Sequence, residues 1–355
     1  MTDPTVPPPS LLAVADRTEE RLRTLLAAER ERWVRVDPQL GTPIDEIGRL
    51  VLSGGKRLRP AFCHWGHVAA GGAPDSAAAL DAGAAIELMH AFALFHDDIM
   101  DDAATRRGQP TTHTVAAEEH RREGWAGESR RFGEGVAILV GDLAFVYADH
   151  LLTGAPPEAW RIWNELRAEL NIGQYLDIVG SVQSTRDIET ADRICRYKSG
   201  KYTIERPLHL GAVLAAPEHI DVLIPHLSAY GLPLGDAFQM RDDVMGAFGD
   251  GAATGKPVGD DLREGKPTPL LARAVHRADR AQRAVLELVG DHTMGADDVA
   301  RIQQVIVDTG ALDELETHIS ALVTEAVDAI TAAPVEPVAV DELVTLAAYV
   351  SARRT

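Results

Sequence analysis

Apolar residues recur along most of this chain at the spacing of an α-helix. In residues 10–36, leucines three and four positions apart are set against Arg and Glu, the pattern of an amphipathic helix. The same periodicity predicts helices over residues 43–53, 136–152, 158–179, 189–215 and 219–244, and a broken helical stretch from residue 268 onward. Because the alternating patterns of strands are scarce, we predict an all-α fold with little or no strand, in a single domain over residues 10–355.

Interruptions of this pattern mark the expected helix ends and connections. Asp75 and Ser76 are candidate N-caps for an Ala-rich helix that runs to about Asp102. Residues 116–134 are charged and contain glycine, which predicts a solvated loop or a frayed segment. The glycines of residues 246–266 predict a second loop. Residues 1–9 are rich in proline and lack an apolar core, which predicts a disordered tail.

Composition and charge narrow the possible partners and compartments. The formal net charge of −19 argues against nucleic acid as a partner, because its phosphates require a basic surface. Cys63 and Cys195 lie far apart in apolar stretches, so we expect buried free thiols in a reducing cytoplasm. We find no signal peptide and no stretch fit to span a bilayer; the best candidate, residues 136–148, is short and carries Asp142. We therefore expect a cytoplasmic protein without stable membrane insertion.

An acidic cluster, HDDIMDD, ends the Ala-rich helix. On a helix Asp97 and Asp101 share one face about 5.4 Å apart, whereas Asp98 points about 100° away. Acidic side chains at a helix C-terminus oppose the helix dipole, and the preceding residues are apolar, so their presence needs a partner. Hard cations such as Mg²⁺ prefer oxygen ligands and often bridge carboxylates to phosphates. The cluster therefore favours a Mg²⁺–diphosphate site, with a solvated polar helix end as the alternative.

Basic residues flank this cluster. Arg106 and Arg107 follow it, and paired arginines suit bidentate contacts to phosphate oxygens. In the segment GGKRLRP, two glycines precede Lys56 and would let the backbone approach an anion closely. His90 lies about two turns before Asp97 on nearly the same face; a buried structural histidine is the alternative interpretation. Together these groups predict a second diphosphate site that does not depend on metal.

A second acidic cluster, QMRDDVMG, lies near residue 242. Gln239, Asp242 and Asp243 are helically spaced, with Gln239 one turn before Asp242, and they could hold further Mg²⁺. Three lysines occur nearby in Gly-containing segments, and each alone is also typical of a protein surface. Taken together they predict a cationic lid over a departing diphosphate: Lys198, Lys256 and Lys266.

The ordered set of these motifs resembles the trans-isoprenyl diphosphate synthases, the polyprenyl synthetase family. The segments HDDIMDDAATRRGQPTTH and FQMRDDVMGAFGD resemble its two aspartate-rich motifs, and GGKRLRP, KSGKYT and TGKPVGDDLREGK match as well. With motifs the resemblance covers roughly residues 50–271. It implies a helical bundle around a deep central cavity, the type I isoprenoid synthase fold, and a homodimer. It also implies a Mg²⁺-dependent prenyltransferase that condenses isopentenyl diphosphate with an allylic diphosphate of C5 to C15 to give a trans-prenyl diphosphate.

The resemblance also implies roles for single residues. Metal binding, by three Mg²⁺ per active site, would fall to Asp97, Asp101 and Asp242. Isopentenyl diphosphate would contact Lys56, Arg59, His90 and Arg107. The allylic diphosphate would contact Arg106, Lys198, Ser199, Gln239, Lys256 and Lys266. Residues acting directly in catalysis would be Asp97, Asp101, Arg106, Lys198, Asp242 and Lys256.

Two positions depart from the family pattern. Ser199 stands where relatives often have Thr, which keeps the hydroxyl group. Gly246 stands where many relatives carry the last Asp of the second motif, and Asp250 is a possible substitute.

Product length should depend on the helix before Asp97, because each helical turn is close to one extended isoprene unit. Ala93 lies one turn below Asp97 with Phe92 beside it, and Met89 lies two turns below. In relatives that stop at C15, two adjacent aromatic residues often occupy the positions of Phe92 and Ala93. The small side chain of Ala93 therefore predicts a C20 product, geranylgeranyl diphosphate, ahead of C15 and of longer chains. Alternatively, Ala93 packs on a neighbouring helix and another residue stops elongation.

Three other functions compete with this prediction. A farnesyl diphosphate (C15) synthase would use the same residues. A class I terpene cyclase also uses an aspartate-rich helix, but it binds one diphosphate and lacks the set of Lys56, Arg59 and Arg107. A catalytically silent partner subunit would be consistent with Gly246.

Overall fold

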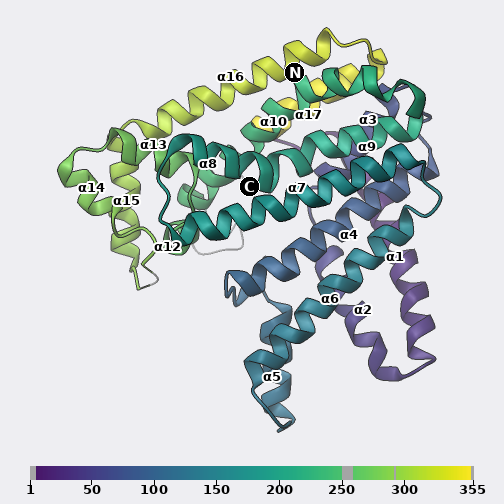
Figure 1. The fold of residues 1–355 in the computed structure, drawn as a ribbon, viewed down its shortest axis with the longest axis horizontal. Coiled ribbons are helices and arrows are strands. Elements are labelled where there is room, and N and C mark those ends of the chain that lie inside the picture. The colour runs from purple at the N-terminus through teal and green to yellow at the C-terminus, as the bar shows by residue number, and fades with distance from the viewer. Residues whose placement is uncertain (1–4, 250–258, 292, 353–355) are drawn as a thin grey trace. The chain divides into compact units, whose positions relative to one another are not determined.

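The computed structural model describes residues 5–249, 259–291 and 293–352, and nearly all regular structure in them is helical (Figure 1). The strands among these residues are β1 (Thr105–Arg106) and β2 (Gln109–Pro110), which pair antiparallel. The prediction of an all-α fold with little strand is therefore confirmed.

The helices gather into two compact groups. The N-terminal unit comprises residues 9–64 and 74–155, and the C-terminal unit comprises the described parts of 1–8, 65–73 and 156–355. The N-terminal unit holds α1 (Pro9–Val34), η1 (Pro38–Leu40), α2 (Gly41–Val51), the first half of α3 (Leu58–Ala69), α4 (Ala77–Met100), β1, β2, α5 (Thr112–Arg122) and α6 (Ser129–Leu151). The C-terminal unit holds the rest of α3, α7 (Pro157–Val182), α8 (Ile188–Cys195), η2 (Arg196–Glu205), α9 (Arg206–Ala215), η3 (Pro217–His219), α10 (Ile220–Phe248), α12 (Asp260–Glu264), α13 (Pro269–Arg277), α14 (Arg280–Leu286), α15 (Ala296–Asp308), α16 (Ala311–Thr331) and α17 (Pro337–Ala352). That the chain is a single domain stays a prediction.

Helix α4 is the central element of the N-terminal unit. Ser76 caps its N-terminus by accepting a hydrogen bond from the Ala79 N–H, as one of the two candidate caps was expected to do. Helix α6 packs along α4 (Figure 1). Gly141 permits this approach, because a Cβ there would lie 2.7 Å from the ring of His96. The face of α4 that carries His96 therefore points toward α6.

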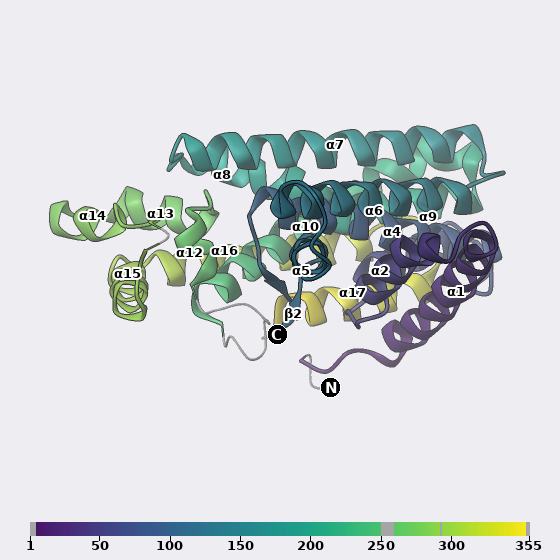
Figure 2. The same ribbon diagram turned by 90° about the horizontal axis from the view of Figure 1, so that it is seen from below.

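Helix α10 organises the C-terminal unit, where it packs against η2 and α16. Its buried apolar residues join a core with α8, α12, α13, α15 and α16. Helices α13, α14 and α15 lie together at one end of this unit (Figure 2). The buried Tyr230 hydroxyl of α10 donates to the Leu343 carbonyl of α17 (2.8 Å), which fastens the last helix to α10.

The helix predicted over residues 189–215 is one continuous helical run, but its middle is not α-helical. Residues Arg196–Glu205 form a π-helix, η2, between α8 and α9. The Arg206 N–H donates to the Lys201 carbonyl five residues earlier, which is the spacing of a π-helix. Apolar periodicity did not predict this, because ten residues make only about two to three turns, too few to distinguish the period of a π-helix from that of an α-helix.

Two predictions about the connections were wrong, and one helix was not predicted. Residues 116–134 are mostly helical, since α5 runs to Arg122 and α6 begins at Ser129. The buried face of α5 consists of Ala, Thr and His rather than large apolar residues, which hid its periodicity. Residues 246–266 are not one loop, because α10 continues through Phe248 and α12 spans Asp260–Glu264. Helix α3, which begins at Leu58 within GGKRLRP, was not predicted.

The prediction that no stretch could span a bilayer was also wrong as stated. Helix α4 is long and apolar enough by length and composition, but 61% of its most apolar window is buried inside the protein, as in a core helix. Both cysteines are free and buried, as expected, and burial raises the pKa of Cys63 to about 12.

Candidate functional site

The first acidic cluster forms the C-terminal turn of α4. The Asp101 N–H donates to the Asp97 carbonyl (2.8 Å), so the two residues are one turn apart on a common face. Both side chains are half-buried, whereas Asp98 is buried and accepts a hydrogen bond from the Arg106 Nε (2.6 Å). Asp98 is therefore engaged by Arg106, and Asp97 and Asp101 are the carboxylates accessible to a ligand.

A tight hairpin carries the two arginines that follow. Arg107 and Gly108 connect β1 to β2, and both have positive φ angles (51° and 71°), as two-residue hairpin turns of type I′ require. Arg106 contacts Asp98 and also Asp97, with Nη2 3.3 Å from Oδ2. Burial alone would lower the pKa of Arg106, but the Asp98 and Asp97 carboxylates outweigh burial and raise it. Arg106 is thus a permanent cation beside the acidic turn.

The GGKRLRP segment places its two arginines differently. Arg57 is buried and donates to Glu87 Oε2 (2.6 Å) and to Glu19 Oε1 (3.1 Å). These contacts stabilise the loop and take up the charge that Arg57 could otherwise direct at a ligand. Lys56 and Arg59, on either side, are half-buried. The Arg57 φ angle of 50° and the Gly54 and Gly55 φ angles of 94° and 147° fix this loop in a conformation that most residues avoid. The structural role of Arg57 could not be predicted, because in the sequence Arg57 is a basic residue of the same segment as Lys56 and Arg59.

Guanidinium groups of the N-terminal unit crowd around His90. Burial and these positive charges hold the pKa of His90 well below its usual value; the groups belong to Arg59, Arg107, Arg106 and Arg57. Burial, with the charge of Arg57 next, also lowers the pKa of Arg107, whose Nη1 donates to the Gly54 carbonyl (2.6 Å). A neutral imidazole among repelling cations is an environment that a bound anion would stabilise.

The three residues expected to set product length do not share one face of α4. Met89, Ala93 and Asp97 are four residues apart and form a single stripe, in which Met89 is fully buried and Ala93 half-buried. Phe92 points toward α6, where its ring lies 4.7 Å from that of Phe145 and 4.6 Å from that of His96 (centroid distances). The stripe below Asp97 is therefore lined by Ala93 and Met89, with Phe92 turned to the side.

The second acidic cluster lies in the last turns of α10. Gln239 Nε2 donates to Asp243 Oδ1 (2.9 Å), while Asp242 is half-buried. Burial raises the pKa of Asp243 well above its usual value; the Gln239 hydrogen bond opposes this rise, and the charges of Asp261, Asp242 and Asp177 add to it. Negative charge is thus concentrated at this end of α10, which favours a cation nearby.

The carboxylate of Asp261 occupies the space beside Gly246. A Cβ atom at position 246 would lie 1.9 Å from Asp261 Oδ2, so no other residue fits there without moving Asp261. Where many relatives carry a third Asp on the helix, this chain brings a carboxylate from α12. Asp250, the substitute considered from the sequence, lies outside the described residues. Asp261 was missed because it is fifteen residues from Gly246; the signal was the paired acids of the GDDLREGK segment.

Lys198 and Ser199 lie on the π-helix η2, both half-buried. Lys198 forms an ion pair with the buried Asp177 of α7, which sequence reasoning did not single out. Lys266 pairs with Glu264 and lies 3.6 Å from Asp261 Oδ1. Lys256 lies outside the described residues.

The residues present fit magnesium. Carboxylate oxygens are the donors that Mg²⁺ prefers, and Asp97, Asp101 and Asp242 offer them from half-buried positions. Within the described ranges, no three His, Cys, Asp or Glu side chains are grouped closely enough to hold an ion by themselves. Mg²⁺ commonly takes one or two protein carboxylates and completes its shell with substrate phosphates and water.

Comparison with known proteins agrees with these motifs. The model of the family described as polyprenyl synthetase matches residues 42–306. A geranylfarnesyl diphosphate synthase of Aeropyrum pernix is 36% identical over 84% of this chain and 89% of its own length. A geranylgeranyl diphosphate synthase of Mycobacterium tuberculosis is 34% identical over 72% of this chain and 68% of its own. A solved geranylgeranyl pyrophosphate synthase of Corynebacterium glutamicum, complexed with isoprenyl diphosphate and magnesium, superposes with a TM-score of 0.90 at 36% identity, covering 96% of this chain and 99% of that one.

Proposed function

Because the chain belongs to the polyprenyl synthetase family, we propose that it condenses isopentenyl diphosphate with an allylic diphosphate and stops at a C20 product, geranylgeranyl diphosphate. It is a prenyltransferase with the all-α type I isoprenoid fold, and its reaction class is the elongation of trans-prenyl diphosphates.

The observation that carries the proposal is an acidic helix end and a group of cations within one helical unit. Asp97 and Asp101 offer oxygen ligands on one stripe of α4. Arg59 and Arg107 are among the cations whose charge, after burial, holds the pKa of His90 well below its usual value. A diphosphate bound there would replace repulsion by attraction. The N-terminal unit thus offers surroundings for one diphosphate that binds with metal and for another that binds without it.

We assign the substrates accordingly. Isopentenyl diphosphate is assigned to Lys56, Arg59, His90 and Arg107. The allylic diphosphate is assigned to Arg106, Lys198, Ser199, Gln239, Lys256 and Lys266, and Mg²⁺ to Asp97, Asp101 and Asp242, with three ions per site as the proposed number.

The proposed chemistry is the departure of diphosphate followed by attack of a double bond. Bound Mg²⁺, whose requirement is typical of the family, would neutralise the charge that develops on the leaving diphosphate. Arg106 and Lys198 would donate hydrogen bonds to the same group. Lys56, Arg59 and Arg107 would hold isopentenyl diphosphate so that its double bond attacks the allylic carbocation. Loss of a proton to the departed diphosphate completes the C5 extension, and apolar walls keep water from quenching the cation.

The C20 length rests on the stripe below Asp97. Ala93 leaves room one turn down, and Met89 is the next side chain along the stripe. The names of the relatives span farnesyl, geranylgeranyl, geranylfarnesyl and nonaprenyl diphosphate synthases, so the family alone permits any of these lengths. The local residues, rather than the family, are therefore the ground for C20.

We also propose a homodimer that works in the cytoplasm. Helix α6 exposes Phe132, Leu139 and Val146, which are 38%, 69% and 58% exposed in the single chain. These residues are seven apart and form one apolar stripe along the helix. A second copy of the chain would cover that stripe; sedimentation of the purified protein at the mass of one chain would contradict the dimer.

The function is tested by incubating purified protein with Mg²⁺, isopentenyl diphosphate and each allylic primer from C5 to C15, followed by chromatography. Prenyl diphosphates ending at C20 support the proposal, and an end at C15 supports a farnesyl diphosphate synthase. A hydrocarbon formed from a single allylic diphosphate would indicate a terpene cyclase. Absence of turnover with every primer would indicate a silent partner subunit.

A further inference from the structure

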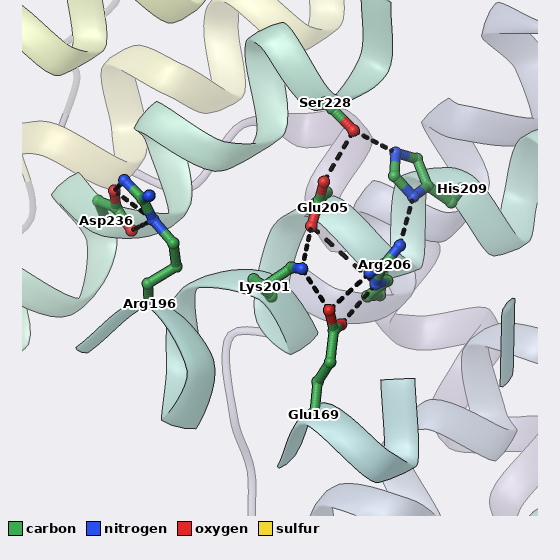
Figure 3. A network of polar contacts seen from close by, with 8 residues as sticks. All are labelled: Glu169, Arg196, Lys201, Glu205, Arg206, His209, Ser228 and Asp236. Carbon is green, nitrogen blue, oxygen red and sulfur yellow. Dashed lines mark hydrogen bonds and ion pairs between the residues drawn. The ribbon is translucent and has the colours of Figure 1, made fainter. Parts of the chain in front are cut away.

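The π-helix η2 is held on both sides by backbone contacts. On α7, a Cβ at Gly173 would lie 2.4 Å from the Lys198 nitrogen. On α10, a Cβ at Gly235 would lie 2.5 Å from the Gly200 carbonyl oxygen. At the start of η2, the Arg196 Nε lies 3.1 Å from Asp236 Oδ2 of α10 (Figure 3). Long π-helical runs are uncommon, so this one depends on its surroundings.

A network of charged side chains fastens the other end of η2 to α7 (Figure 3). Glu169 of α7 accepts hydrogen bonds from the Arg206 Nε and Nη2, both at 2.6 Å, and also pairs with Lys201. His209 Nδ1 lies 3.3 Å from Arg206 Nη1. Ser228 of α10 donates to Glu205 Oε1 (2.7 Å) and contacts His209 Nε2 (3.1 Å). Four elements, α7, η2, α9 and α10, therefore meet in one network.

The charges in this network balance and are shielded from solvent. Glu169 and Glu205 supply two carboxylates, and Lys201 and Arg206 supply two cations; the four side chains are 8%, 5%, 13% and 15% exposed. Burial raises the pKa of Glu169, but hydrogen bonds from Arg206 and Lys201 outweigh it and lower that pKa. Removing one partner of a buried ion pair leaves an uncompensated buried charge. We therefore expect η2 to rearrange when one partner of this network is removed.

Loss of this network would move Lys198 and Ser199. If η2 relaxed to an α-helix, each turn would contain nearly one residue fewer, and the residues at the start of η2 would rotate about the helix axis relative to α9. Lys198 would then leave Asp177, which lies eight residues after Glu169 on the same helix. We infer that Glu169, Lys201 and Arg206 are positioning residues, which hold η2 against α7 so that Lys198 and Ser199 meet the allylic diphosphate. This inference rests on the proposed function.

The test compares two buried glutamates that each hold a basic residue. Glu169→Gln weakens the anchoring of η2. Glu87→Gln is the matched control, because Glu87 holds Arg57 in the loop that carries Lys56. Steady-state kinetics are measured with each substrate varied in turn. Glu169→Gln should raise the KM for the allylic diphosphate about tenfold and the KM for isopentenyl diphosphate less than twofold. Glu87→Gln should instead raise the KM for isopentenyl diphosphate more than the KM for the allylic diphosphate.

A milder variant covers the case in which Glu169→Gln fails to fold. Lys201→Gln keeps the bidentate pair between Glu169 and Arg206, and should raise the allylic KM about threefold. Glu169→Asp should recover part of the lost affinity. Equal changes in both KM values, or no change in either, would assign the network to stability alone and overturn the inference. Absence of turnover in the wild-type chain would instead refute the proposed function, and the inference with it.

Discussion

Replacing Ala93 by phenylalanine should shorten the product by one isoprene unit. Ala93 lies between Asp97 and the fully buried Met89 on one stripe of α4, about 6 Å below Asp97 along the helix axis. In the proposed site, a phenyl ring there would occupy the position assigned to the last C5 unit of a C20 chain. Forcing extra volume into a packed apolar site costs about 1–3 kcal/mol, which slows the step from C15 to C20 by about 5- to 150-fold.

The assay is product chromatography with isopentenyl diphosphate and geranyl diphosphate as substrates. Wild-type protein should end at C20, and Ala93→Phe should accumulate C15 while total condensation changes little. Phe92→Ala is the matched control, because Phe92 faces Phe145 of α6 and not the stripe. It should lower stability and leave product length unchanged. An unchanged product profile in Ala93→Phe would refute the proposed role of this stripe.

Four further substitutions test the candidate site and the stability of the fold. Asp97→Asn and Asp101→Asn should each lower kcat about 100-fold or more without lowering Tm, because each removes the charge of a proposed Mg²⁺ ligand; activity within twofold of wild type would contradict this assignment. Gly246→Ala should raise the Mg²⁺ concentration for half-maximal activity about tenfold, because its Cβ would lie 1.9 Å from Asp261 Oδ2 and displace that carboxylate. An unchanged Mg²⁺ titration would argue against a role for Asp261 near the metal. His209 has a pKa lowered to about 3, chiefly by burial and then by the charge of Arg206, so the folded state holds it neutral. Its contribution to stability is therefore present above the unfolded pKa near 6.5 and is lost as pH falls toward 3, by about 1.4 kcal/mol per unit of pKa difference. Chemical unfolding between pH 7 and 4 should show a shallower loss of stability in His209→Gln, and parallel curves would contradict this.

The sequence predicted what depends on local spacing. Asp97 and Asp101 lie on one face of α4 because four residues make about one turn, and Gln239 reaches Asp243 for the same reason. Long helices with large apolar residues, such as α1 and α7, were predicted to within a few residues. Helix α5 was not predicted, because its buried face, which includes His113 and Ala116, has no large apolar side chains.

Features that depend on tertiary contacts could not be predicted. Arg57 and Arg59 belong to one short motif, yet Arg57 is buried against Glu87 because α4 brings that carboxylate to it. The partnership of Gly246 with Asp261 depends on how α12 packs on α10. The π-helical form of η2 reflects its contacts with α7 and α10 rather than its own residues.

The most direct test of the central claim is a single elongation experiment with the purified chain. Isopentenyl diphosphate in excess and farnesyl diphosphate as primer, with Mg²⁺, should give geranylgeranyl diphosphate and inorganic diphosphate in equal amounts, with elongation ending at C20. No product from farnesyl diphosphate, or continued elongation well beyond C20, would contradict the account.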